Sequence, residues 1–93
     1  MKVESFASVW DALEDNPVER ASLKIRSGLM IAIEETVEGW RTTQKRAATR
    51  LGVTQPRLND LLRGRISKFS LDALVDIATR AGLNITVKVK KAA

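Results

Sequence analysis

Side chains that could recognise a base pair gather between residues 41 and 65. Gln55 carries an amide that can match the N6 and N7 edge of adenine, and Arg57 carries a guanidinium that can match O6 and N7 of guanine. Each such bidentate contact discriminates against a wrong base by about 1 to 3 kcal/mol. The same segment holds seven Lys and Arg against a single acid, Asp60. These residue types indicate binding to a polyanion rather than bond-breaking chemistry.

The side chains on which most enzyme catalysis depends are missing. Cysteine and histidine are both absent, which removes disulfides, zinc-ligand sets, thiolate nucleophiles and imidazole acids or bases. Glu34, Glu35 and Glu38 form an acidic group, but their spacing on an amphipathic helix places them on its solvent-exposed polar face. We therefore predict no enzyme activity, no catalytic residues, no cofactor and no metal.

Size and charge narrow the class of protein further. The chain has 93 residues, a net charge of +5 and a pI near 10.1, which suits one domain with an anionic partner, although a solvated cationic surface would give the same total. The longest apolar run, residues 29–33, falls far short of the roughly 20 residues that a membrane span needs. With no apolar stretch typical of a signal peptide, we expect a soluble cytoplasmic protein and no membrane partner.

Two helices are predicted in the first half of the chain. Residues 1–16 are acidic and carry apolar side chains at i, i+3, i+4 and i+7, the period of an amphipathic helix. Asn16 as N-cap and Pro17 in the first turn predict a second, longer helix. We expect it to stop near Gly39, and Gly28 is a candidate break inside it. The apolar face of the first helix consists of Phe6, Val9, Trp10 and Leu13.

Two short helices joined by a tight turn are predicted next. Thr43 and Thr54 can each cap a helix through the side-chain hydroxyl, and Gly52 can take the left-handed conformation that ends the first of them. The second is expected over residues 55–63. Ala47 is small enough to let the two helices cross closely. The wedge between them is filled by Val53, Leu58 and Leu61. This is helix-turn-helix geometry.

A fifth helix and a strand complete the prediction. Ser70 caps a helix that Gly82 closes, and the alternating residues that begin at Asn84 and end at Lys90 have the period of a half-buried strand. A lone strand leaves its backbone groups unpaired, so we expect pairing with the same strand of a second subunit, or less favourably with the segment around Val3. The predicted domain organisation is a single domain, 1–93, made of an acidic helix (1–16), a helix-turn-helix core (17–82) and a strand with a basic tail (83–93).

The spacing T-x3-A-x3-L-G-V-T-Q-x2-L-x2-L-x2-G, from Thr43 to Gly64, resembles the helix-turn-helix family typified by Cro and phage repressors, often called XRE-like. The resemblance spans roughly residues 25–81. It implies an all-α, five-helix, lambda-repressor-like fold. The runs LGVTQPRLNDLLRG and FSLDAL are similar to the small XRE-like antitoxins of the HigA type. That resemblance implies a homodimer that binds operator DNA, represses its own operon and neutralises a RelE-like toxin encoded beside it.

In this family the second helix of the motif enters the major groove, which places Gln55 and Arg57 at base edges and Asn59 one turn further on. Pro56 stands where many XRE-like proteins have a polar base reader, and it offers only ring contact. Asp60 has three open roles: accepting from cytosine N4, pairing with Arg57 or Arg63, or repelling phosphate. The sequence does not choose between them.

Phosphate contacts are expected at both ends of the motif. Thr43 and Gln44 present first-turn amides, and Lys45 and Arg46 add charge. The loop after the second helix adds Arg65 and Lys68, which are better candidates than Arg50. The predicted DNA-binding residues are Thr43, Gln44, Thr54, Gln55, Pro56, Arg57, Asn59, Asp60, Arg63, Arg65 and Lys68.

Three alternatives remain open from the sequence. A stand-alone XRE-like regulator would have no toxin partner. A protein-interaction module would have lost DNA binding, an idea that Pro56 and Asp60 on the reading face make conceivable. The acidic N-terminal helix is either a cap over the core or a surface for the toxin. For a DNA-binding dimer, two recognition helices about 34 to 36 Å apart predict an operator with an inverted repeat.

Overall fold

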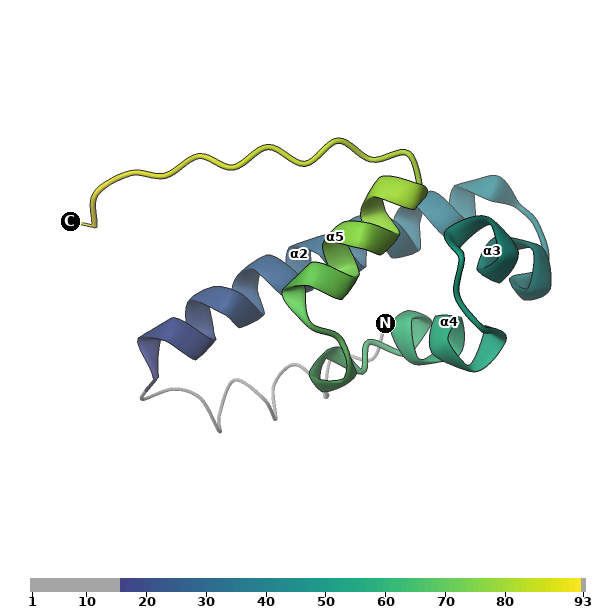
Figure 1. Cartoon of the computed structure of the whole chain (residues 1–93), viewed down its shortest axis with the longest axis horizontal. Coiled ribbons are helices and arrows are strands. Elements are labelled where there is room, and N and C mark those ends of the chain that lie inside the picture. The colour runs from purple at the N-terminus through teal and green to yellow at the C-terminus, as the bar shows by residue number, and fades with distance from the viewer. Residues whose placement is uncertain (1–15, 93) are drawn as a thin grey trace.

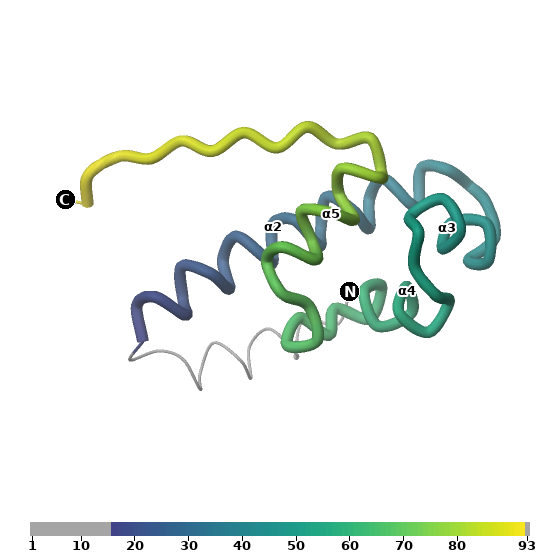
Figure 2. Tube along the Cα trace, viewed as in Figure 1, coloured from purple at the N-terminus to yellow at the C-terminus, as the bar shows by residue number. Residues whose placement is uncertain are grey.

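Residues 16–92 are described by a computed structural model, in which four α-helices and one short 3-10 helix follow one another (Figure 1 and Figure 2). They are α2 (Pro17–Trp40), α3 (Gln44–Leu51), α4 (Gln55–Leu62), η1 (Ile66–Lys68) and α5 (Leu71–Arg80). The all-α class is thus confirmed for these residues, while the acidic helix predicted before Asn16 lies outside them. None of the four described helices is long and apolar enough to cross a membrane.

The long helix α2 begins at the predicted cap. The side-chain oxygen of Asn16 accepts a hydrogen bond from the backbone N–H of Glu19 at 3.1 Å, and Pro17 is the first helical residue. The Asn16 side chain thus satisfies one of the free N–H groups of the first turn. Pro17 has no backbone N–H, so it adds no unsatisfied donor there. The cap therefore fixes where the chain enters the helix.

The predicted break of α2 at Gly28 was wrong, whereas its predicted stop near Gly39 was correct to within one residue. The helix runs through Gly28 without interruption and passes Gly39 to end at Trp40, after which Arg41 adopts a left-handed φ of 50° and its N–H donates to Glu38 O at 3.2 Å. The physical reason is tertiary packing, since one face of α2 is buried along its length and a single glycine costs only about 1 kcal/mol. The buried α2 residues are Leu23, Met30, Ile33 and Val37.

The two short helices of the motif form as predicted. Thr43 Oγ1 accepts from the N–H of Arg46, and Thr54 Oγ1 accepts from the N–H of Arg57, each at 3.2 Å. Gly52 takes a φ of 69° and closes α3. The helix α4 ends at Leu62, one residue earlier than expected.

A single core joins these helices. The helix α5, capped by Ser70 as predicted, packs against α2, and α3 and α4 close one end of the pair (Figure 1). Trp40, the last residue of α2, is partly buried against it. The core residues beyond those of α2 are Ala47, Ala48, Leu51, Leu58, Leu61, Ile66, Phe69, Leu74, Ile77, Ala78 and Ala81. The apolar side of α4 thus packs in the core, and its polar side takes no part in the core.

The predicted C-terminal strand is not formed in the single chain. Residues 84–90 are extended but belong to no sheet, because residues 16–92 contain no second extended segment that could pair with them. The alternative partner around Val3 lies outside the described residues. Because the tail is unpaired, Val87 and Val89 have 78% and 90% of their surfaces exposed. In Figure 1 this tail runs back along α2, on the side away from α4.

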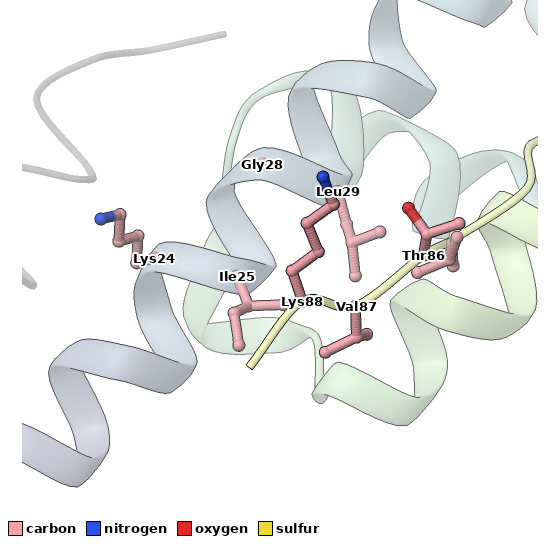
Figure 3. A pocket seen from close by; sticks show the side chains of 8 residues that line it. Lys24, Ile25, Gly28, Leu29, Thr86, Val87 and Lys88 are labelled. Atoms are coloured by element: carbon pink, nitrogen blue, oxygen red, sulfur yellow. The ribbon is translucent and has the colours of Figure 1, made fainter. Parts of the chain in front are cut away.

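An open groove of about 420 Å³ separates the tail from α2. Figure 3 shows Ile25 and Leu29 of α2 on one side of it and Thr86, Val87 and Lys88 of the tail on the other. Its lining is mostly apolar, and Gly28 in its floor has open space in front of it. The tail therefore keeps its backbone edge and part of its apolar face uncovered.

Candidate nucleic-acid interface

The helix α4 turns a polar side away from the core. Leu58 and Leu61 are fully buried, whereas Gln55 and Pro56 at its first turn are exposed. Asn59, one turn after Gln55, is half-buried, and Arg63 is exposed just beyond the last turn. The 3.6-residue period of the helix produces this division, because leucines three residues apart share one face. An exposed amide at the start of a short, anchored helix can reach a base edge in a groove.

Arg57 does not extend freely into solvent. Its Nη1 donates a 2.7 Å hydrogen bond to the backbone carbonyl of Lys68, and its guanidinium carbon lies 4.0 Å from the centroid of the Phe69 ring. Phe69 itself is buried in the core. A cation over an aromatic face and a charge-assisted hydrogen bond together tie α4 to the loop that follows it. One N–H of the Arg57 guanidinium is thus committed to the loop rather than to a base.

Asp60 pairs with two cations from the loop. One carboxylate oxygen lies 2.9 Å from Arg65 Nη1, and the other lies 3.7 Å from Lys68 Nζ. The partners considered from the sequence were Arg57 and Arg63, so the ion pairs found here are different ones. Gly64, with a φ of 69°, turns the chain so that the N–H of Arg65 donates to the carbonyl of Asp60 at 3.1 Å. This reversal brings the loop cations back beside α4.

The start of α3 offers a second polar surface. Thr43, Gln44, Lys45 and Arg46 are all exposed. The hydroxyl of Thr43 accepts from Arg46 N–H, and its own O–H stays available as a donor. Arg50, by contrast, stacks on Trp40 with its guanidinium carbon 3.9 Å from the ring centroid. Arg50 is therefore engaged on the side of α3 that faces α2.

A family model described as a helix-turn-helix domain matches residues 12–90. This span covers most of the 93 residues and includes every element of the structure. The chain belongs to the helix-turn-helix domain family. No curated protein matches the sequence closely enough to count as a relative. Membership of this family supports DNA binding in general terms.

One residue that supports the loop after α4 in this helix-turn-helix protein was not predicted from the sequence. Arg26 of α2 donates from Nη1 to the carbonyls of Ile66 and Phe69, at 3.4 and 3.2 Å. It therefore holds the loop from the α2 side, while Arg57 holds it from the α4 side. Residues 40 or more positions apart leave no periodic signal, so only the folded chain reveals this contact. The loop that carries Arg65 and Lys68 is consequently braced on two sides.

The helix-turn-helix domain has no arrangement suited to a metal within residues 16–92. No group of three or more His, Cys, Asp or Glu side chains in that part of the chain could hold an ion. The surface around α3 and α4 instead combines amides, hydroxyls and guanidinium or ammonium groups. These are the donors that contact phosphates and base edges.

Proposed function

We propose that this protein is a sequence-specific DNA-binding repressor, in which α4 enters the major groove. The single observation that carries the proposal is the division of α4 between buried Leu58 and Leu61 and an exposed first turn that begins with Gln55. The groove is wide enough for one α-helix, and its base edges carry a distinct pattern for each base pair. Membership of the helix-turn-helix family supports the same use of the helix.

Base recognition is assigned to Gln55 and Asn59, which follow one another at i and i+4 on α4. Pro56 offers its ring to a thymine methyl group. Arg57 was predicted to read guanine, but its contacts with Phe69 and the Lys68 carbonyl favour a positioning role. The proposal therefore moves direct readout from the guanidinium to the two amides.

Phosphate contacts are assigned to groups on either side of α4. Thr43 and Gln44 present the first turn of α3, while Arg65 and Lys68 extend from the loop. Both loop cations are about half exposed, with 42% and 54% of their side-chain surfaces accessible. Arg63 and Thr54 lie at the two ends of α4 and complete the proposed surface. Contacts of this kind set the position of the protein on DNA and make its affinity depend on salt.

A homodimer through residues 84–90 is part of the proposal. The unpaired edge of this tail and the exposure of Val87 and Val89 support it, because antiparallel pairing of two tails would satisfy the backbone and cover apolar surface. The tail lies away from α4 (Figure 1), so pairing leaves α4 uncovered. A two-fold dimer would then require an operator with an inverted repeat.

The antitoxin role rests on the resemblance to HigA-type proteins in the sequence alone. It predicts that a RelE-like toxin encoded beside this protein binds it, with the acidic segment before Asn16 as a candidate surface. Co-purification with the product of the adjacent gene would test this, using a variant that begins at Asn16 as the comparison. If no toxin gene lies beside the gene for this protein, the antitoxin role is excluded in favour of a stand-alone regulator.

A mobility-shift assay with the protein's own promoter tests the central proposal. The expected result is a complex that survives excess random duplex DNA and dissociates steeply as salt rises, because several phosphates are neutralised. The double variant Gln55→Ala/Asn59→Ala should lose the preference for the promoter while keeping weak binding to any duplex. A folded protein that shifts no DNA would instead favour the protein-interaction module.

A further inference from the structure

An acid stands between two cations on a surface that is otherwise basic. Asp60 is the only acid in residues 41–65, and its two carboxylate oxygens approach Arg65 and Lys68 at 2.9 and 3.7 Å. Its side chain is 19% exposed, so it lies under the more exposed ends of its partners. A phosphate contacted by the same two cations would place its own oxygens in an equivalent arrangement. The carboxylate thus occupies the place of a bound anion.

The loop is also held by hydrogen bonds that do not involve the Asp60 carboxylate. Backbone hydrogen bonds close the turn, from Arg65 N–H to the Asp60 carbonyl and from Lys68 N–H to the Arg65 carbonyl, at 3.1 and 3.0 Å. Arg26 and Arg57 fix the loop carbonyls independently. The two cations are about half exposed, which reduces what their pairing with Asp60 contributes to stability. An acid at this position therefore acts on more than the shape of the loop, because it also neutralises two cations of the proposed DNA-contacting surface.

We propose that Asp60 is an internal competitor of DNA phosphate, which occupies Arg65 and Lys68 in the free protein and so limits sequence-independent binding. The inference rests on the proposed function and deepens it by assigning the residue that sets the electrostatic part of affinity. Binding to random DNA comes almost entirely from charge neutralisation and counterion release. A DNA phosphate can pair with Arg65 and Lys68 only after these two side chains have broken their ion pairs with the Asp60 carboxylate. Asp60 thereby lowers the effective charge of the surface by about one.

The test compares Asp60→Asn with Asp76→Asn, which removes the same charge. Asp76 pairs with Arg80 at 3.2 Å on α5, and neither residue belongs to the proposed DNA-contacting set. Fluorescence anisotropy is measured with a random-sequence duplex and with the promoter duplex over a range of potassium chloride concentrations. Asp60→Asn should bind random DNA about fivefold more tightly near physiological salt, with a salt slope steeper by about 0.9, as expected for one more neutralised phosphate. Asp76→Asn should change affinity by less than twofold.

A double-mutant cycle gives an independent measurement. Arg65→Gln should reduce affinity for random DNA more in the Asp60→Asn background than in the wild type, because Asp60 neutralises part of Arg65 in the wild type. The inference is overturned if Asp60→Asn gains no more affinity than Asp76→Asn, or if the cycle shows no coupling. Either result with a wild type that binds its promoter leaves the proposed function intact. A wild type that binds neither duplex refutes both. Thermal unfolding verifies that each variant is folded.

Discussion

At the scale of single residues, Arg57 shows how a side chain can lie in a reading helix and still serve the structure. Its guanidinium is shared between a buried aromatic ring and a carbonyl of the next loop. Gln55, two positions earlier, has an exposed side chain. Because base readout requires a side chain that can leave the protein surface, the two residues should respond differently to truncation.

Arg57→Ala should lower the free energy of unfolding by about 1 to 2 kcal/mol, from the loss of the cation–π contact and one charge-assisted hydrogen bond. It should weaken binding to all operator variants by a similar factor, because the loop with Lys68 loses its anchor to α4. Urea unfolding and a randomised operator library measure the two effects.

The matched variant is Gln55→Ala. We expect it to keep the wild-type stability and to relax discrimination at one base pair by about 1 to 3 kcal/mol. If Arg57→Ala relaxed one position instead, Arg57 would be a base reader and the positioning role would be wrong.

At the scale of elements, the turn between α3 and α4 depends on Gly52. Its φ of 69° is a conformation that side chains with a Cβ adopt at a cost, and an added Cβ would meet the guanidinium of Arg80. Gly28 is the opposite case, because it lies inside α2 with open space in front of it. Two glycines in one chain therefore have opposite expected responses to the same substitution.

Gly52→Ala should destabilise the protein by about 1 to 2 kcal/mol, since the left-handed conformation is unfavourable for a residue with a Cβ. Gly28→Ala should stabilise it by about 0.5 to 1 kcal/mol through helix propensity. Chemical denaturation of both variants is the measurement. Equal effects of the same sign would show that backbone conformation does not control this turn.

At the scale of the whole molecule, the tail has no partner within the described chain. Its backbone edge is uncovered, and a mostly apolar groove lies between the tail and α2, with Ile25 and Val87 on opposite sides (Figure 3). A second copy would cover both the edge and the exposed valines. The oligomeric state is therefore the property through which the tail would control DNA binding.

Val87→Pro should convert the proposed dimer to a monomer in sedimentation, because proline removes a backbone donor and cannot continue a paired strand. Operator binding should weaken as the second half-site is lost. Val87→Thr retains the N–H and the β-branched shape, so it should remain dimeric. A dimer that persists in Val87→Pro would exclude pairing through this strand.

Local chemistry in the sequence determined where most described elements begin and how the motif turns. The caps at Asn16, Thr43, Thr54 and Ser70 and the left-handed Gly52 were all predicted and confirmed. Each depends on a side chain and on amides within three or four residues of it, so the sequence contains the whole interaction. The leucine face of α4 was predictable for the same reason, from its period.

Tertiary structure alone decided the features that depend on distant residues. Packing against the core carried α2 through Gly28 without a break. Arg26 reached the loop from a helix some 40 residues away. The tail stayed unpaired because a strand needs a neighbour, and residues 16–92 supply none. Hydrogen bonds between residues close in sequence can be predicted from the sequence, whereas contacts across the core depend on how all the helices pack together.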